Sequence, residues 1–215
     1  SVMKTRHLGY DGKGQRVINS IKEAEEAFHE FGKKPCIIEE FIDFNIEVST
    51  ISVRDTYGNT YTYPPAENTH KNHILDTSEV PASIDKKTEN FLRDISTKMI
   101  KNLNYIGVLA IEFFILKDST ILVNEIAPRV HNSGHWTLDG SDISQFEQHI
   151  RAISRLEILT PKLIYKTKML NLIGADINIW ETKSNSKNEK IYIYGKTETK
   201  KGRKMGHVNF LEELK

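Results

Sequence analysis

The sequence predicts an α+β fold in which short β-hairpins alternate with amphipathic helices. Two observations predict it: apolar strand-like runs recur along the chain, and runs with a helical period separate them. After about residue 157 only short strand-like runs remain, so we expect a small β-rich domain there. With 215 residues, 38% of them hydrophobic, the chain is long enough for one or two packed cores.

Charge and cysteine content argue against several classes of function. Lysine plus arginine (30) nearly balances aspartate plus glutamate (29), so the overall basic field of a nucleic-acid-binding protein is absent. No apolar run approaches the ~20 residues of a membrane span. Cys36 is the single cysteine, so we expect no internal disulfide and a reducing compartment, the cytoplasm.

The first forty residues are expected to form a small unit of strands around one helix. Ser20, followed three residues later by Glu23, has the form of a capping box and predicts where this helix begins. The expected elements are a glycine-rich loop at 9–15, a strand at 16–18, a helix at 20–31 and a strand at 35–42.

The middle of the chain is expected to contain two paired strands, a long connection and a helix. The connection is polar and contains three prolines, so we expect it to be irregular and to carry function. One helical stripe is expected to face the core: Phe91, Leu92, Ile95, Met99 and Leu103. The expected elements are strands at 46–54 and 60–63, the connection at 64–81 and the helix at 85–103.

Two glutamates on a predicted β-hairpin are the most informative feature of the sequence. The strands at 107–116 and 120–126 flank a turn at Asp118, and a turn centred there places Glu112 opposite Glu125. The same register pairs Phe114 with Val123. Like charges directly opposite each other destabilise a sheet, and a shared Mg²⁺ would remove the repulsion. The alternative is a metal-free glutamate at a strand end and a second one on the surface.

The remainder of the chain is expected to begin with an irregular segment and a helix. The apolar residues of this helix, Ile143, Phe146, Ile150 and Ile153, are expected to face inward. The expected elements are the irregular segment at 128–140, the helix at 142–156, strands at 168–173, 190–194 and 207–210, and a polar loop at 183–189.

The loop at 9–15 is rich in glycine but matches neither of the common nucleotide-binding motifs. A Walker loop needs Ser or Thr after Gly-Lys, and Gly14 follows Lys13 here. Glycines still allow backbone N–H groups to approach phosphates closely, and Lys4 and Lys13 could add positive charge. An ordinary mobile turn is the alternative.

Three further segments offer groups for a nucleotide or an anion. The strand end at 39–42 could present its backbone to an adenine edge, Glu47 could accept ribose hydroxyls, and His70 could contact a phosphate. Exposed side chains without a role are the alternative at each position. Arg129 is a natural bidentate partner for a carboxylate, bicarbonate or phosphate, and three polar residues follow it: His131, Asn132 and Ser133.

A last basic segment lies in the predicted C-terminal strands. Lys196 and the run Gly-Arg-Lys at 202–204 could form a phosphate pocket, because two cations beside a glycine can surround an anion. A solvated charge run is the alternative.

The order of these motifs resembles the ATP-grasp superfamily. In detail the sequence resembles the N5-carboxyaminoimidazole ribonucleotide synthase family within it. The most specific match is Asn-Glu-Ile-Ala-Pro-Arg-Val-His-Asn-Ser-Gly-His-Trp at 124–136. Further matching segments are 4–6, 9–15, 144–149, 171–174 and 202–207. The chain departs from the family pattern at 6–9, where a second glycine is common in the family.

The resemblance implies an ATP-grasp fold with three parts in this chain. They are a partial first subdomain at 1–40, a second subdomain with the metal site at 41–156, and the C-terminal β-rich domain at 157–215. The resemblance also implies that this chain lacks the family's N-terminal domain. We therefore expect a fragment whose first strand lacks a neighbour, whose isolated activity is weak, and whose 9–15 loop is poorly ordered without nucleotide. The family also suggests a homodimer for the full-length enzyme.

The implied activity is the ATP-dependent carboxylation of 5-aminoimidazole ribonucleotide with bicarbonate. The products are N5-carboxyaminoimidazole ribonucleotide, ADP and phosphate, in purine (IMP) biosynthesis, and the cofactors are ATP and Mg²⁺. Two alternatives stay open: a non-catalytic nucleotide-binding fragment, and another ATP-grasp ligase. Neither a nucleic acid nor a membrane is an expected partner.

The resemblance also implies roles for individual residues. The expected metal ligands are Glu112 and Glu125, and the expected catalytic residues are Asp11, Lys13 and Arg129. Asp11 would accept a proton from the reacting amine. The expected ATP-binding residues are Lys4, Gly9, Tyr10, Asp11, Gly12, Lys13, Gly14, Gln15, Glu39, Glu40, Phe41, Ile42, Glu47, His70, Asn124 and Glu125. The expected substrate-binding residues are Tyr10, Asp11, Arg129, His131, Asn132, Ser133, Lys196 and Arg203.

Overall fold

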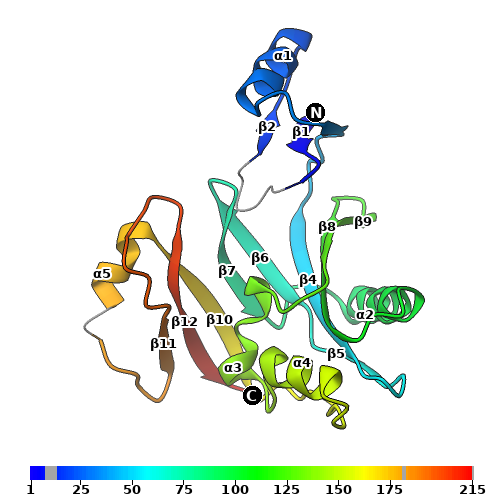
Figure 1. Cartoon of the computed structure of the whole chain (residues 1–215). Helices are drawn as coiled ribbons and strands as arrows, with labels where there is room; N and C mark the ends of the chain where they lie inside the picture. The colour runs from blue at the N-terminus through cyan, green and yellow to red at the C-terminus, as the bar shows by residue number, and fades with distance from the viewer. Residues whose placement is uncertain (8–13, 181–182, 215) are drawn as a thin grey trace.

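Figure 1 shows the computed structural model, which describes residues 1–7, 14–180 and 183–214. Within these residues the strands form two separate sheets, one of three strands and one of nine. The three-stranded sheet and its helix stand at one end of the molecule, above the large sheet in Figure 1. No helix in the described ranges is long and apolar enough to span a membrane.

The small sheet contains the first forty residues in the strand order β2-β1-β3. The central strand β1 pairs antiparallel with both neighbours, and helix α1 lies beside the sheet. The elements are β1 (Val2–Thr5), β2 (Gln15–Val17), α1 (Ile21–Glu30) and β3 (Cys36–Glu39).

Helix α1 begins where the sequence predicts. The Ser20 side chain accepts a hydrogen bond from the Glu23 N–H (3.2 Å). The Glu23 carboxylate accepts the N–H of Asn19 (2.8 Å). In a regular capping box it would accept the N–H of the N-cap residue, Ser20, so this second bond is made one residue earlier. Ala27 of this helix packs against Met3 of β1 and joins the two elements in a small core.

The large sheet has the strand order β11-β12-β10-β7-β6-β4-β8-β9, and β5 pairs with β4. The pairing of β10 with β7 joins the C-terminal strands to the same hydrogen-bonded sheet. Its strands are β4 (Ile46–Arg54), β5 (Thr60–Thr62), β6 (Ala66–Lys71), β7 (Ile74–Val80), β8 (Gly107–Ile115), β9 (Ile121–Ala127), β10 (Tyr165–Ile173), β11 (Glu189–Ile193) and β12 (Lys204–Glu213).

Helix α2 (Lys86–Asn102) covers one face of the large sheet. Leu92 and Ile100 are fully buried and pack in one apolar cluster with Phe113 of β8. The Asp85 side chain caps the helix by accepting the Thr88 N–H (2.6 Å). Apolar burial on this face therefore holds the strands that carry the glutamate hairpin.

The inward stripe predicted for α2 is correct only in part. Phe91 and Leu103 are 50% and 54% exposed, so their placement in the core is wrong. The buried face is centred on Leu92, Ser96 and Ile100, which leaves Phe91 and Leu103 at the edges of the stripe. The predicted residues that do pack inward are Leu92, Ile95 and Met99.

The opposite face of the large sheet is covered by three short elements, and this segment is less irregular than predicted. They are η1 (Asn132–Gly134), α3 (Thr137–Gly140) and α4 (Gln145–Ile153). Trp136, between η1 and α3, is fully buried, and its ring meets that of Tyr63 edge to face at 6.0 Å. This aromatic pair anchors the segment that leads out of the glutamate hairpin.

The prediction that Ile150 and Ile153 of α4 face inward is wrong. They are 56% and 51% exposed, whereas Gln145 and Gln148 are fully buried. Both glutamine amides hydrogen-bond to backbone groups of neighbouring segments, which allows polar side chains on the buried face. A reading based on hydrophobic period alone assigns such a helix to the opposite face.

The polar connection predicted at 64–81 is instead the hairpin of β6 and β7. Its turn residues Asn72 and His73 have φ of 51° and 63°, values typical of a two-residue hairpin turn. Polar side chains inside the hairpin bond to one another: Ser78 Oγ donates to Asn68 Oδ1 (2.8 Å). Because these strands are buried through polar contacts, they carry no apolar alternation that would reveal them.

The glutamate hairpin of β8 and β9 pairs Glu112 with Glu125, as the sequence predicts. The predicted pairing of Phe114 with Val123 is wrong, because Val123 faces Phe113. The register therefore changes by one residue between the glutamate pair and the turn.

Two local irregularities explain this register. The turn holds one residue more than a two-residue turn: the Leu116 N–H donates to Thr120 O (2.9 Å), and Ser119 has φ of 68°. A β-bulge then leaves Asn124 as an extra residue without a cross-strand partner. On the far side of the bulge, from Glu112 and Glu125 onward, the pairing is the predicted one. The two changes of register cancel at the glutamates.

The C-terminal part adds one small apolar cluster and two short helical elements. Leu172, Met205 and Val208 are buried in this cluster together with Ile177. β10 and β12 are longer than the predicted strands at 168–173 and 207–210, because they pair with each other over nearly their full length. The helical elements are η2 (Gly174–Asp176) and α5 (Ile177–Trp180).

Candidate active site

A cleft of about 990 Å³ lies between the small sheet and the large sheet. Lys4 lines it from β1, Glu47 and Glu112 from the centre of the large sheet, and Lys204 from the start of β12. The predicted site residues that line the cleft are Lys4, Gly14, Gln15, Glu39, Glu40, Phe41, Ile42, Glu47, His70, Glu112, Asn124, Glu125, Arg129, His131 and Asn132.

Some predicted site residues are not among the lining residues. Ser133 is fully buried behind the cleft wall. Arg203 and Lys196 were predicted on strands, but they lie in the connection between β11 and β12. There the Arg203 guanidinium donates a hydrogen bond to Glu198 O (3.2 Å). The residues predicted in the glycine-rich loop, Gly9, Tyr10, Asp11, Gly12 and Lys13, lie outside the described residues.

The facing glutamates form the centre of a group that suits a metal ion. Ligand atoms of Glu112, Glu125 and His131 all lie within 4.8 Å of one another. Glu112 is 7% exposed, and its burial together with the charges of Glu47 and Glu125 raises its pKa to about 7. A bound cation would stabilise the charged form of Glu112 against both its burial and the repulsion from the neighbouring carboxylates. Two carboxylates and space for phosphate oxygens are the donors that Mg²⁺ prefers, so the residues fit this ion.

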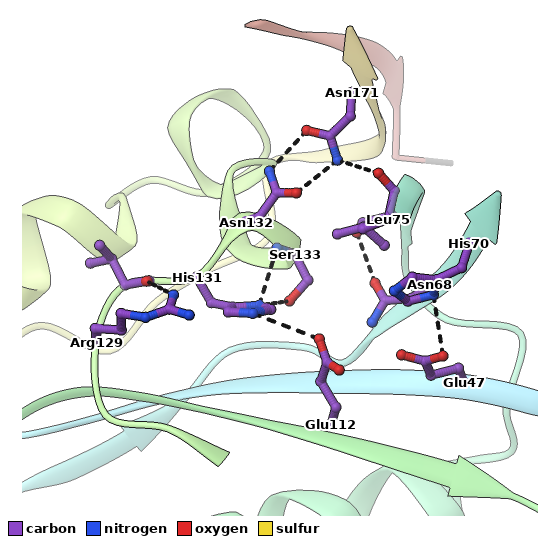
Figure 2. Close-up of polar contacts among 12 residues, drawn as sticks. Glu47, Asn68, His70, Leu75, Glu112, Arg129, His131, Asn132, Ser133 and Asn171 are labelled. Carbon is purple, nitrogen blue, oxygen red and sulfur yellow. Dashed lines mark hydrogen bonds and ion pairs between the residues drawn. The ribbon is translucent and has the colours of Figure 1, made fainter. Parts of the chain in front are cut away.

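His131 faces the metal group with a neutral ring. Its Nε2 lies 3.7 Å from Glu112 Oε1, and its Nδ1 lies 2.9 Å from Ser133 Oγ (Figure 2). Burial, with a smaller effect of the Arg129 charge, lowers the pKa of His131 to about 3. Nδ1 accepts the Ser133 N–H (3.4 Å), which leaves Nε2 to face Glu112.

A second buried carboxylate, Glu47, lies beside the first. Glu47 is 6% exposed and its carboxylate contacts His70 Nδ1 at 3.2 Å (Figure 2). Burial alone would lower the pKa of His70, but the hydrogen bond and charge of Glu47 outweigh it and raise that pKa. The cleft floor therefore joins two acidic side chains and a histidine that carries a proton readily.

Two asparagines tie the loop after the hairpin to the C-terminal strands. The amides of Asn132 and Asn171 exchange two hydrogen bonds of 2.9 and 2.8 Å, and Asn171 also donates to Leu75 O (Figure 2). η1, β10 and β7 are thereby held together at one end of the cleft. The side chain of Asn132 is largely engaged in this pair.

The wall near β3 combines charge with aromatic rings. Lys4 Nζ contacts Glu39 at 2.5 Å, so one predicted phosphate-binding residue pairs with one predicted adenine-binding residue. Phe44 stacks on Phe114 with ring centroids 4.3 Å apart and planes 6° apart. Both rings line the cleft, and neither was predicted as a site residue. An apolar wall of this kind suits the face of a planar base.

Lys204 is a cleft residue that the sequence indicated only as part of a basic run. Its charge adds to the burial that lowers the pKa of His131 and partly offsets the raised pKa of Glu112, so it lies within electrostatic reach of the metal group. Its neighbour Arg203 was the predicted residue. Lys204 is the first residue of β12 and lines the cleft, whereas Arg203 precedes the strand and is not among the lining residues. The predicted strand at 207–210 began too late to distinguish the two.

A cluster of aromatic and histidine side chains behind the cleft was not predicted. His207 is 2% exposed, its Nδ1 contacts Tyr194 Oη at 2.8 Å, and its ring stacks on Tyr192 at 4.6 Å. The His135 ring lies 4.9 Å from it. Burial lowers the pKa of His207 to about 3 and that of His135 to about 4.

The free energy of unfolding of the metal-free chain is expected to fall as the pH drops from about 6 to about 5. His131, His135 and His207 stay neutral when folded but titrate near 6.5 when unfolded, so the unfolded chain binds more protons here. Each contributes a slope of up to about 1.4 kcal/mol per pH unit. His70 has a raised folded pKa and opposes this loss only weakly, because the unfolded histidine is already mostly protonated below pH 6.

Glu112 acts with the opposite sign in this window. Its folded pKa of about 7 lies above the unfolded value, so the folded chain holds one additional proton. Glu112→Gln should therefore make the loss of stability on acidification steeper. Urea titrations in EDTA at the two pH values measure both slopes. A flat profile in the variant would contradict the neutral state of the buried histidines.

Comparisons with known proteins agree with this fold. Residues 1–146 match the ATP-grasp domain model, and residues 167–215 match the model of the phosphoribosylaminoimidazole carboxylase C-terminal domain. The chain therefore belongs to the ATP-grasp family, and its two sheets enclose a cleft with a pair of facing acidic side chains.

Relatives of the chain within this family include N5-carboxyaminoimidazole ribonucleotide synthases. The chain is 48% identical over 209 residues (96% of this chain) to the Brucella melitensis synthase and 45% identical over 214 residues (99% of this chain) to the Bacillus subtilis synthase. A crystal structure of the Aspergillus clavatus enzyme, in complex with ADP and 5-aminoimidazole ribonucleotide, covers 98% of the chain with 29% identity and a TM-score of 0.88. The chain spans 58%, 56% and 57% of the lengths of these three proteins.

Proposed function

We propose that this chain carries the nucleotide and metal site of an enzyme that carboxylates 5-aminoimidazole ribonucleotide at the expense of ATP. Bicarbonate would supply the carboxyl group, and N5-carboxyaminoimidazole ribonucleotide, ADP and phosphate would be released, as a step of purine biosynthesis. The facing pair of Glu112 and Glu125 in the cleft carries the proposal. The names of the relatives supply the substrates.

Phosphoryl transfer depends mainly on positioning and on neutralising charge. Glu112 and Glu125 would hold Mg²⁺, with Asn124 at the bulge beside them, and Mg²⁺ would neutralise the charge that develops on the phosphates. Lys4 and the loop at 9–15, with Lys13, would cover the phosphates from the small sheet. Lys4 lines the cleft from the small sheet and the two glutamates line it from the large sheet.

The adenosine part of ATP would lie against the wall near β3. Residues 39–42 would present their backbone to the adenine edge, Glu47 would accept ribose hydroxyls, and His70 would contact a phosphate. The stacked rings of Phe44 and Phe114 support this placement, because an apolar surface beside backbone polar groups suits a purine.

The substrates would lie at the end of the cleft nearer η1 and β12. Arg129, which is exposed and lines the cleft, would orient bicarbonate or its phosphorylated form. Asp11 would accept the amine proton, and Tyr10 would contact the substrate. The ribonucleotide would contact His131 and Asn132, with Ser133 acting through its bond to His131, and its 5′-phosphate would bind Lys196 and Arg203.

We also propose that the full-length enzyme is a cytoplasmic homodimer. The single cysteine supports a reducing compartment, and the family resemblance supports the dimer. Sedimentation equilibrium of the full-length enzyme tests the oligomeric state, and a monomer at all concentrations would contradict it.

A phosphate-release assay tests the proposed reaction. The chain, or the full-length enzyme that contains it, is incubated with ATP, Mg²⁺ and bicarbonate, with and without 5-aminoimidazole ribonucleotide. Release that depends on the ribonucleotide supports the proposal. Release that depends on another acceptor, or ATP binding without release, indicates another ligase or a nucleotide-binding protein.

Arg203→Ala is expected to weaken ribonucleotide binding selectively. The loss of one charged hydrogen bond costs roughly 1.5–3 kcal/mol, or about 10- to 150-fold in affinity. In the full-length enzyme the KM for the ribonucleotide should rise by about that factor while the KM for ATP changes little. Arg151→Ala is the control, because Arg151 pairs with Glu147 on the surface of α4. An equal rise of both constants in Arg203→Ala would show that the phosphate role is wrong.

A further inference from the structure

We propose that Gln145 is a positioning residue for the magnesium site, acting through His131. The proposal rests on the proposed function, since it concerns the same metal group. It adds a residue that is not among those lining the cleft and that lies on helix α4, on the far side of the loop that follows the glutamate hairpin.

The side-chain amide of Gln145 both accepts a hydrogen bond from the backbone of His131 and donates one to it. The His131 N–H donates to Gln145 Oε1 (2.9 Å), and Gln145 Nε2 donates to His131 O (2.7 Å). The same Nε2 lies 3.2 Å from His135 Nδ1. Gln145 is fully buried, so water does not replace these bonds when they are lost.

The loop between His131 and α4 closes tightly around this amide. Thr137 Oγ1 donates to Gly134 O (2.6 Å) and accepts the Gln145 N–H (3.0 Å). A Cβ at Gly134 would lie 2.6 Å from Gln145 Oε1, so a larger residue there would have to displace the Gln145 amide. The loop conformation therefore depends on the amide of Gln145, and not only on its own turn.

His131 passes this constraint on to the metal group. Its backbone is held by Gln145 and its Nδ1 by Ser133, which leaves only Nε2 to face the cleft (Figure 2). Nε2 lies 3.7 Å from Glu112 Oε1, and both residues belong to the group that suits a metal ion. Partners that orient a metal-binding carboxylate affect metal affinity although they do not bind the metal.

The same helix contains a matched control. Gln148 is also fully buried and exchanges two hydrogen bonds with the backbone of one residue, Leu159. Its Oε1 accepts the Leu159 N–H (3.1 Å). Leu159 lies in the segment after α4 and is not among the residues that line the cleft. Loss of either amide should therefore cost similar stability, but only one of them supports the metal group.

The experiment compares Gln145→Met with Gln148→Met. The dissociation constant of ADP is measured by calorimetry with MgCl₂ and with EDTA, and thermal unfolding is followed in parallel. In Gln145→Met the Mg²⁺-dependent gain in ADP affinity should fall about 10-fold. In Gln148→Met it should stay unchanged although the melting temperature falls similarly. A purely structural role of Gln145 would not alter this ratio.

Gly134→Ala is a second route to the same test, because its methyl group displaces the Gln145 amide without removing it. The same fall in the Mg²⁺-dependent gain supports the proposal, and an unchanged gain in a folded Gln145→Met or Gly134→Ala overturns it. Failure of both variants to fold while Gln148→Met folds would assign the amide to stability alone and also overturns it. If the unchanged chain binds no ADP in either buffer, the proposed function fails as well.

Discussion

Replacing Glu112 or Glu125 with glutamine is expected to remove most of the stabilisation that Mg²⁺ and ATP together give this chain. Each substitution removes one of the two facing carboxylates while keeping the size of the side chain. A metal ligand should matter more than its supporting partners, so we expect a loss of more than about 100-fold in Mg²⁺-dependent ATP affinity. Thermal shifts with ATP, in MgCl₂ and in EDTA, measure it.

The same substitutions should not destabilise the metal-free chain. Glu112 is buried against the charges of Glu47 and Glu125, so a neutral glutamine relieves repulsion and the melting temperature in EDTA should rise slightly at pH 8. Glu79→Gln is the control, because Glu79 is exposed on β7 and pairs with Lys168. An unchanged Mg²⁺-ATP shift in both hairpin variants would remove the metal assignment.

Trp136→Ala is expected to cause the largest loss of stability among single changes on the site-bearing side of the sheet. The ring is fully buried in the cluster that contains Tyr63 and Met169, and its removal should cost about 3–5 kcal/mol. For a chain of this size, that corresponds to a fall in melting temperature of roughly 6–20 °C. Chemical and thermal unfolding followed by far-UV circular dichroism measure it.

The second tryptophan provides the comparison for this prediction. Trp180 is only half-buried and packs against Phe210 at the edge of the C-terminal cluster, so Trp180→Ala should cost clearly less. Trp136 also lies between His131 and Gln145 in the sequence, and its loss should loosen the loop that bears on the metal group. Equal costs for the two variants would mean that the Trp136 cluster does not anchor this face.

The glutamate pair shows how a correct prediction can rest on an incomplete reason. Alternation along each strand indicates which face a residue occupies, but the register depends on the turn and on any bulge. The turn before Thr120 and the bulge at Asn124 each shift the pairing by one residue in opposite directions. Glu112 and Glu125 therefore meet as predicted, although the pairs between them and the turn do not.

Polar burial explains most of the errors in the fold. The strands β6 and β7 and the inner face of α4 are held by hydrogen bonds among buried polar groups, such as Ser78 with Asn68 and the amide of Gln148 with Leu159. Periodicity detects burial only where it is apolar. From the sequence, β6 and β7 were therefore predicted as a loop, and the apolar residues of α4 were assigned to its buried face.

Local sequence was sufficient for the hairpin with its acidic pair, for the starts of α1 and α2 after Ser20 and Asp85, and for the motifs that indicate an ATP-grasp chain. These features depend on neighbours within a few residues. Long-range packing alone placed Lys204 in the cleft, brought His131 against Glu112 and set the amide of Gln145 behind it. Such contacts join residues on different strands and helices. They are selected by the free energy of packing the whole fold, which the spacing of residues in the sequence does not reveal.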